Sequence, residues 1–268
     1  MPKVYSPSQT VIFSECPFKW YTQCVLRYSH ESGQTEPQRL GQAVASAMEY
    51  FNNVWKDSGV KPSGPDVIAA ALSKAEIPEL VDSPAYNAMR KVLTKHLSTE
   101  PTPDSWLPIA VETPRPDHGH CRADVVYQTP SGRVVRDYKY TTSCESRYVV
   151  GRLQGYGDHP QRYHYAWSED ASLFQIVLIS GQPVKVHEQV WSCDPADVTR
   201  WLKSQQGKWA VMEQMERGEI APWLSDRHST KYGPCSLYDW CQNHKGDHTL
   251  LPMLGYVQRP KSDATTSL

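Results

Sequence analysis

Apolar residues recur at helical spacing through the first hundred residues of the chain. Residues 40–55 place their apolar side chains along one side of a helix. Ser6 and Pro7 have the form of an N-cap and a first helical position, which predicts a helix up to Glu15. A second helix is expected from Phe18, after Cys16-Pro17 stops the first.

Breaks in the pattern divide the remaining helical part. Residues 30–39 are polar and predict a loop, and residues 61–66 are rich in Pro and Gly. Residues 66–98 have a helical pattern that is interrupted near Pro78 and Pro84.

The middle of the chain has strand patterns. Strands are predicted at 107–112, in two runs within 119–142, and at 172–180 and 183–191, with a helix from Pro160 between them. Asp194-Pro195 predicts the start of a long amphipathic helix. This order of elements predicts an α/β or α+β fold with helical insertions.

Composition narrows the class of protein. The chain has 268 residues, a formal net charge of -1 and 39% apolar residues, which is a globular balance. No apolar run approaches a membrane span, and the N-terminus lacks a signal-peptide core, so we expect an intracellular, cytoplasmic protein. The seven cysteines are an odd count, which favours thiols or a metal site over disulfides.

Three charged residues stand inside the two strand-like runs at 119–142: Asp124, Asp137 and Lys139. A loop centred between Pro130 and Ser131 places Asp124 opposite Asp137, with Lys139 on the same face. The apolar pattern of both strands favours this register. A type I turn with a bulge at Gly132 suits the turn residues and would put the two aspartates on opposite faces.

Two interpretations of these three residues remain open at this stage. Two carboxylates so close repel each other unless a proton or a cation lies between them, and hard oxygen ligands suit Mg²⁺ or Mn²⁺. Lys139 would then orient or deprotonate an attacking water. The alternative is a surface salt bridge on a half-exposed hairpin.

Five segments of the chain, in order, resemble the RecB-like branch of the PD-(D/E)XK nuclease superfamily, which includes AddB-type, CRISPR-associated and phage nucleases. They are YSPSQTVIFSECPFKWY, LGQAVASAMEYF, RADVV with VRDYKYTT, PQRYHY, and KYGPCSLYDWC. The resemblance implies one nuclease domain over 1–256, with a mixed central sheet flanked by helices. It also implies a helical insertion at about 57–105, a cysteine segment at 228–241 and a disordered tail at 257–268.

The resemblance also implies roles for individual residues. Asp124 and Asp137 would be metal ligands, joined by the carbonyl of Tyr138, and Lys139 would be the catalytic lysine. Gln161 and Tyr165, four positions apart on one helical face, would help to position Lys139 or the DNA strand.

One departure from the family pattern lies in the helix at 40–55. The family places a metal-binding histidine where this chain has Ala45. Glu49 lies one turn later on the same face and is the candidate replacement ligand, or else a solvated helix residue. Gly41 either permits close helix packing or is simply a tolerated glycine.

A second departure lies in the cysteines. The family often holds a [4Fe-4S] cluster with four cysteines, and Cys16, Cys235 and Cys241 match three of those places. The fourth falls at Ser229 or Tyr232, and the adjacent His228 is the candidate fourth ligand. The alternative is a set of buried free thiols.

The expected function is a Mg²⁺- or Mn²⁺-dependent deoxyribonuclease, an exonuclease of replication, recombination or repair that is encoded by a phage or a bacterium. Its expected partners are DNA with a single-stranded end and a recombination or replication protein, with no membrane. The alternative is a degenerate nuclease fold that binds DNA or a protein without cutting, which Ala45 and the missing fourth cysteine favour.

Overall fold

The computed structural model describes residues 3–30, 34–142, 146–157, 160–180, 185–223, 229–230, 233–234, 237, 240–241 and 247–259. The chain divides into two compact units, one formed by residues 34–203 and the other by residues 1–33 with 204–268. Each unit is described by itself below. The single domain expected over 1–256 stays a prediction.

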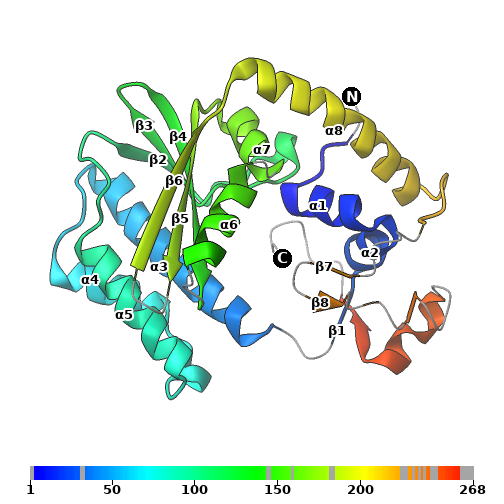
Figure 1. Ribbon diagram of the computed structural model, residues 1–268, viewed down its shortest axis with the longest axis horizontal. Helices are drawn as coiled ribbons and strands as arrows, with labels where there is room; N and C mark the ends of the chain where they lie inside the picture. Colours follow the sequence, from blue (N-terminus) through cyan, green and yellow to red (C-terminus); the bar gives the residue numbers. More distant parts are fainter. Residues whose placement is uncertain are drawn as a thin grey trace. The chain divides into compact units, whose positions relative to one another are not determined.

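A five-stranded sheet forms the centre of the 34–203 unit (Figure 1). Its strands, in spatial order, are β2 (Leu107–Val111), β3 (Val125–Thr129), β4 (Gly132–Thr141), β5 (Leu173–Ser180) and β6 (Lys185–Ser192). The β4–β5 pair is parallel and the other pairs are antiparallel. The expected mixed sheet flanked by helices is therefore confirmed.

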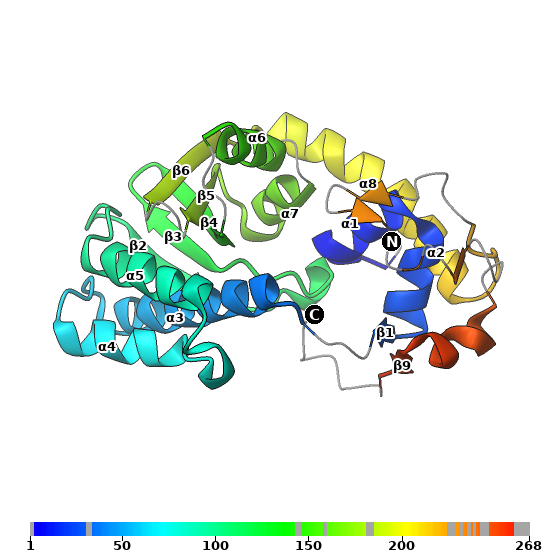
Figure 2. The same cartoon turned by 60° about the horizontal axis from the view of Figure 1, so that its bottom comes forward.

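Helices α3 (Glu36–Ser58) and α5 (Pro84–Ser98) cover one face of the sheet (Figure 2). Helix α4 (Pro65–Lys74) packs on these two helices, and the short 3₁₀ helix η2 (Pro78–Leu80) joins α4 to α5 and adds to the same core. The predicted breaks near Pro78 and Pro84 are confirmed, but α3 begins four residues before Leu40. A capping box between Thr35 and Gln38 starts the helix inside the predicted loop.

The opposite face of the sheet is covered by α6 (Ser146–Gly157) and α7 (Pro160–Glu169). Buried side chains of both helices, such as Val149 and Tyr165, pack with strand residues such as Val135 and Ile176. Helix α7 was predicted. Helix α6 was not, since its sequence holds three glycines, which disfavour a helix.

The hairpin of β3 and β4 has the register that the apolar pattern favours. Val125 pairs with Arg136 and Thr129 pairs with Gly132, so Pro130 and Ser131 form a two-residue turn. The bulged alternative is wrong. Gly132 is nevertheless needed there, because its φ of 122° is one that residues with a side chain rarely adopt.

Arg136 interrupts the apolar face that the hairpin turns toward α3 and α5. It is 1% exposed, and its guanidinium lies 3.0 Å from the carboxylate of Glu100 and donates to Gln175 at 2.9 Å. His96 Nε2 lies 2.9 Å from the other oxygen of Glu100. Burial opposes ionisation of Glu100, but His96 and Arg136 outweigh it and lower its pKa. This buried network links His96, near the end of α5, to Arg136 on β4.

The other unit contains most of the remaining elements. They are α1 (Pro7–Glu15), α2 (Pro17–Trp20), the π-helix η1 (Tyr21–Val25), β1 (Tyr28–His30), β7 (Ser229–Thr230), β8 (Gly233–Pro234), the 3₁₀ helix η4 (His248–Leu254) and β9 (Tyr256–Gln258). The long helix α8 (Pro195–Glu216) has residues in both units. The predicted Ser6 cap is confirmed, and β9 takes in the first two residues of the expected tail.

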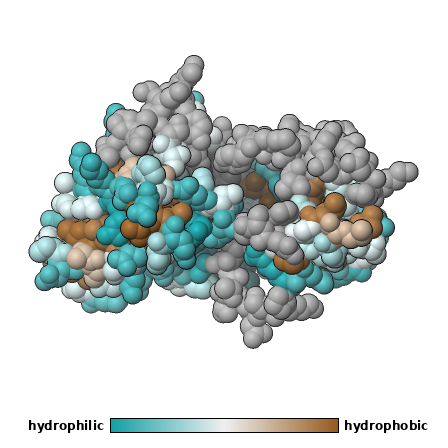
Figure 3. Space-filling model, turned by 90° about the horizontal axis from the view of Figure 1, so that it is seen from below, coloured by the Kyte–Doolittle hydropathy of each residue, from teal (hydrophilic) through white to brown (hydrophobic). Residues whose placement is uncertain are grey.

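The surface of the 34–203 unit is mixed in polarity. Figure 3 shows a band of hydrophobic residues among hydrophilic ones on this unit. Val60 and Val81, beside the ends of α3 and η2, are 70% and 54% exposed. Among the described residues, no helix is both long and apolar enough to cross a membrane.

Candidate active site

Asp137 and Lys139 lie on strand β4 and point to the face that α6 and α7 cover. The Asp137 side chain is 1% exposed, and the Lys139 side chain is 30% exposed. Lys139 Nζ lies 2.6 Å from Asp137 Oδ2. The lysine therefore reaches from a solvent-accessible position to a carboxylate that would be costly to bury alone.

Asp124 comes just before β3, beside Asp137. Its Oδ2 accepts a hydrogen bond of 2.6 Å from the backbone N–H of Tyr138. Burial and the negative charge of Asp137 raise the pKa of Asp124 well above its usual range, although Lys139 opposes this. The two carboxyls thus share a site that either a proton or a cation would stabilise.

Gln161 and Tyr165 reach the same point from helix α7. Gln161 Nε2 donates to Asp137 Oδ1 at 2.8 Å and to the Tyr165 hydroxyl at 2.9 Å. The Tyr165 hydroxyl donates to the carbonyl of Arg122 at 2.7 Å. Burial, with the nearby charges of Asp137 and Asp124, raises the pKa of Tyr165, so the hydroxyl keeps its proton.

Helix α3 carries the position at which the chain departs from the family's metal-binding histidine. Glu49 is exposed, and Ala45 has no side chain that could bind a metal. The charge of Glu49 does act on another carboxyl, Glu112, at the end of β2. Glu49 as a ligand stays a prediction, and so does the carbonyl of Tyr138.

Two residues of this region were not predicted from the sequence. Glu112 follows β2 with a φ of 45°, and its pKa is raised by burial and by the charges of Glu49 and Asp137. Arg122 Nε lies 3.5 Å from Glu112 Oε2. A carboxylate at a strand end and an arginine two positions before Asp124 were the only signals available in the sequence.

The donor atoms at this site suit a hard cation. Asp137 Oδ2 is buried, and the Lys139 ammonium lies 2.6 Å from it. No group of three or more His, Cys, Asp or Glu side chains in that part of the chain could hold a metal alone. Two carboxylates with the other positions left to water and phosphate are typical of Mg²⁺.

The expected iron–sulfur ligands are described only in part. Cys16 and Cys241 both pack against a small core that contains Phe18 and Trp240. Cys235 and His228 lie outside the described residues. A cluster needs four ligands, so the [4Fe-4S] cluster stays a prediction.

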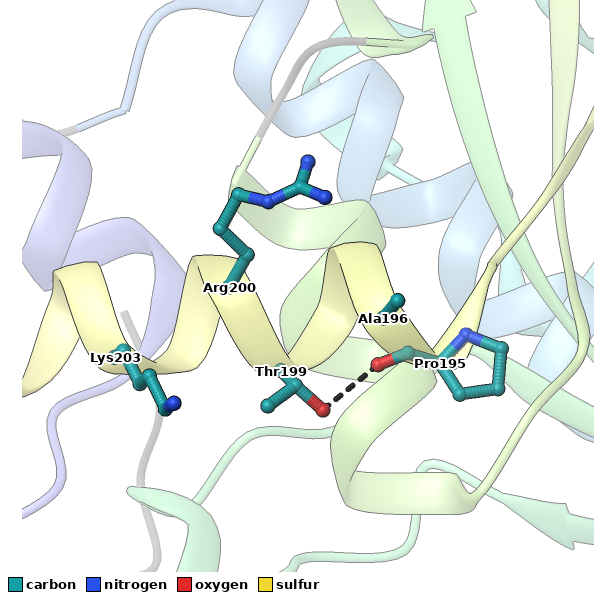
Figure 4. A pocket seen from close by; sticks show the side chains of 5 residues that line it. All are labelled: Pro195, Ala196, Thr199, Arg200 and Lys203. Carbon is teal, nitrogen blue, oxygen red and sulfur yellow. Dashed lines mark hydrogen bonds between the residues drawn. The ribbon is translucent and has the colours of Figure 1, made fainter.

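Two surface hollows of the 34–203 unit are lined by none of the residues around Asp124 and Asp137. One, of about 460 Å³, is formed by Pro195, Ala196, Thr199, Arg200 and Lys203 at the start of α8 (Figure 4). Arg200 and Lys203 point to opposite sides of the helix there, so their charges do not converge on one ligand. The other, of about 370 Å³, lies between the end of α5 and β6.

Comparison with known proteins decides the family. The model of the PD-(D/E)XK nuclease superfamily matches residues 4–242. This range includes every strand of the five-stranded sheet and the candidate site residues Asp124, Asp137, Lys139, Gln161 and Tyr165. The chain belongs to the PD-(D/E)XK nuclease superfamily. Members of this superfamily are generally nucleases that use Mg²⁺ or Mn²⁺.

Other comparisons add little to this membership of the PD-(D/E)XK superfamily. No curated protein matches the chain. Among solved structures, the crystal structure of SSO0001 is similar at 14% identity, covering 62% of this chain and 74% of that one with a TM-score of 0.25. That score is too low to support an argument about function.

Proposed function

We propose that the protein is a divalent-cation-dependent deoxyribonuclease of the RecB-like branch, which hydrolyses phosphodiester bonds as an exonuclease. The supporting observation is the convergence of Lys139 and Gln161 on the buried carboxylate of Asp137, beside Asp124. The processing of DNA ends in replication, recombination or repair is the setting that the resemblance implies.

Each side chain has a distinct task in this proposal. Asp124 and Asp137 would hold Mg²⁺ or Mn²⁺, which would supply polarisation of the phosphate and a lower pKa for a bound water. Lys139 Nζ stays beside Asp137 and donates to the attacking water or to the phosphate oxygens as their charge grows. Gln161 fixes the orientation of the Asp137 carboxylate through Oδ1.

Digestion of labelled DNA tests the proposal. Linear single-stranded, linear double-stranded and circular DNA are incubated with Mg²⁺ or Mn²⁺ and wild-type protein, Asp137→Asn or Lys139→Ala. Wild type is expected to cut linear DNA only. The rate should fall about 10²- to 10³-fold in Lys139→Ala, the range for loss of one donor to developing charge.

An ion pair in the same unit supplies the matched controls: the Asp104 side chain is 90% exposed and the Lys61 side chain 23% exposed. Lys61 Nζ lies 3.3 Å from Asp104 Oδ1. Asp104→Asn and Lys61→Ala are expected to cut at the wild-type rate. Equal cutting by all five proteins would place the activity elsewhere. DNA binding without any cutting by wild type would favour the degenerate fold, which Ala45 and the exposed Glu49 also favour.

A further inference from the structure

The loop between β2 and β3 borders the acidic pair, because it runs from Glu112 to Asp124. This loop is fastened to α7. Arg115 Nε donates to Glu169 Oε1 at 2.7 Å, and His164 Nε2 lies 2.8 Å from the carbonyl oxygen of His118. The residues of the loop therefore hold defined positions relative to the helix that carries Gln161.

Arg122 is the loop residue that is most directly joined to the catalytic network. Its carbonyl accepts the hydrogen bond of the Tyr165 hydroxyl, and that hydroxyl accepts one from Gln161, which also binds Asp137. Three hydrogen bonds thus fix the Arg122 peptide with respect to the buried carboxylate.

The Arg122 side chain is placed at the edge of the acidic pair. It is 33% exposed, and its Nε lies 3.5 Å from Oε2 of Glu112, whose side chain is 19% exposed. The backbone N–H of Glu112 lies within hydrogen-bonding reach of the carbonyls of Ala123 and Asp124, at 3.2 and 3.3 Å. Glu112 is therefore attached to the peptide that carries Asp124, and it brings the guanidinium to that point.

Charge explains why an arginine is needed there. A DNA strand that enters this site brings phosphates toward the carboxylates of Asp124, Asp137 and Glu112, which repel it. A guanidinium offers planar paired donors that match phosphate oxygens. The ion pair with Glu112 is long at 3.5 Å and the Arg122 side chain is 33% exposed, so a phosphate can approach the guanidinium from solvent.

We propose that Arg122 binds a backbone phosphate of the DNA strand beside the cleaved bond, and that Glu112 orients its guanidinium before the strand arrives. This inference rests on the proposed function, because it assigns the substrate of that site to a particular side chain. Arg122 acts as a positioning residue: it holds the strand, while the cation site and Lys139 act on the bond.

Salt dependence of DNA binding tests the role of Arg122 separately from cutting. Binding of labelled single- and double-stranded oligonucleotides is measured in EDTA at several salt concentrations. Loss of one phosphate contact should reduce the log–log salt slope by about 0.9 for duplex and about 0.7 for single strands. Arg122→Ala and Arg122→Gln should show this change and bind several-fold more weakly at low salt, whereas Arg122→Lys should keep the slope.

Arg90→Ala is the matched control. Arg90 has the same 33% side-chain exposure, also faces a glutamate, and lies on α5 at the other face of the sheet. It should keep the wild-type slope. Thermal unfolding of each variant checks that it folds, and Arg122→Gln keeps much of the side chain's bulk if Arg122→Ala does not fold.

The outcomes separate this inference from the nuclease proposal. A wild-type slope in both Arg122→Ala and Arg122→Gln, or an equal change in Arg90→Ala, would overturn it. So would wild-type protein that does not bind DNA. A changed slope in a protein that does not cut DNA would support Arg122 as a phosphate contact and would contradict the proposed nuclease function. In a protein that cuts, Arg122→Ala should raise KM more than it lowers kcat.

Discussion

At the residue scale, Asp137 explains why the strands of the hairpin carry charges. Burying the Asp137 carboxylate, which is 1% exposed, would cost folding free energy if it had no partners. Its partners are Lys139 Nζ at 2.6 Å and Gln161 Nε2 at 2.8 Å. Burial and the charge of Asp137 raise the pKa of Asp124 beside it, although Lys139 opposes the rise. The charges are thus accounted for as one site rather than as a surface salt bridge.

Gln161 gives a prediction at this scale. Removing its amide in Gln161→Ala frees the Asp137 carboxylate to rotate, so kcat should fall about 10- to 100-fold, as for other partners of metal ligands, with little change in KM. Tyr165→Phe should have a smaller effect, because Gln161 still reaches Asp137. Steady-state kinetics on linear DNA measure both.

The double variant is the decisive comparison. Tyr165 acts on Asp137 through Gln161. The fold decrease in kcat of the double variant should therefore be smaller than the product of the two single fold decreases. Gln128→Ala, at an exposed glutamine of β3, is the control and should keep wild-type kinetics. Fully multiplicative effects, or a Gln161→Ala enzyme as fast as wild type, would contradict this network.

Much of the site could be predicted from residues alone. Alternation along two strands placed Asp124, Asp137 and Lys139 on one face, and the resemblance to the family pointed to Gln161 and Tyr165. Glu112 and Arg122 could not be found in this way. Their meeting depends on the path of the loop between two strands, for which the sequence has no periodic pattern.

At the element scale, the hairpin shows a conflict between turn chemistry and strand pattern. The residues Thr-Pro-Ser-Gly favour a bulge, but the observed pairing keeps Val125, Tyr127 and Val134 together on one buried face. Burial of a whole face outweighs the preference of one turn. Ala123, Val126 and Val135 pack on the other face of the sheet.

Two glycines give a paired prediction for elements of the same unit. Gly132→Ala should lower the free energy of unfolding by about 1–3 kcal/mol, because the φ of 122° is strained for alanine. Its Cβ would also lie 2.9 Å from Ser172 Oγ. Gly41→Ala should raise that free energy by about 0.5–1 kcal/mol, because alanine favours a helix and its Cβ would meet no atom within 4 Å beyond the backbone of α3 itself.

Urea unfolding of both variants measures the difference. Stabilisation by Gly132→Ala would contradict the observed turn. Destabilisation by Gly41→Ala would mean that this glycine permits close helix packing after all.

The low helix propensity of glycine also explains why α6 was not predicted from the sequence. The glycines of α6 disfavour a helix, and packing of Val149 and Leu153 on the sheet stabilises it.

At the scale of the whole molecule, the chain forms two compact units with separate cores, while the superfamily match extends over residues of both. The sequence predicted the fold class and most elements. It could not predict the division, because the strand β9 pairs with β1 more than two hundred residues earlier, and such short strands have no pattern of their own.

The pH dependence of unfolding gives a prediction for the molecule as a whole. Burial lowers the pKa of His164 from 6.5 to about 4, so between these values the unfolded chain binds more protons than the folded one. The free energy of unfolding should therefore fall as the pH is lowered, by about 2 kcal/mol from this residue between pH 7 and pH 5.

His164→Gln should lose this part of the pH dependence. Its stability at pH 8 reports the cost of altered packing, and the slope between pH 7 and pH 5, measured by urea unfolding, reports the titration. A variant that keeps the wild-type slope would show that His164 is not protonated on unfolding in this range.

Anomalous diffraction from crystals grown with Mn²⁺ tests the central claim, that Asp124 and Asp137 jointly hold the cation. The account predicts one strong peak about 2–2.4 Å from a carboxylate oxygen of each residue. The peak should disappear in Asp137→Asn and persist in Asp104→Asn. A wild-type crystal with the peak elsewhere, or a cation that contacts only one of the two aspartates, would contradict it.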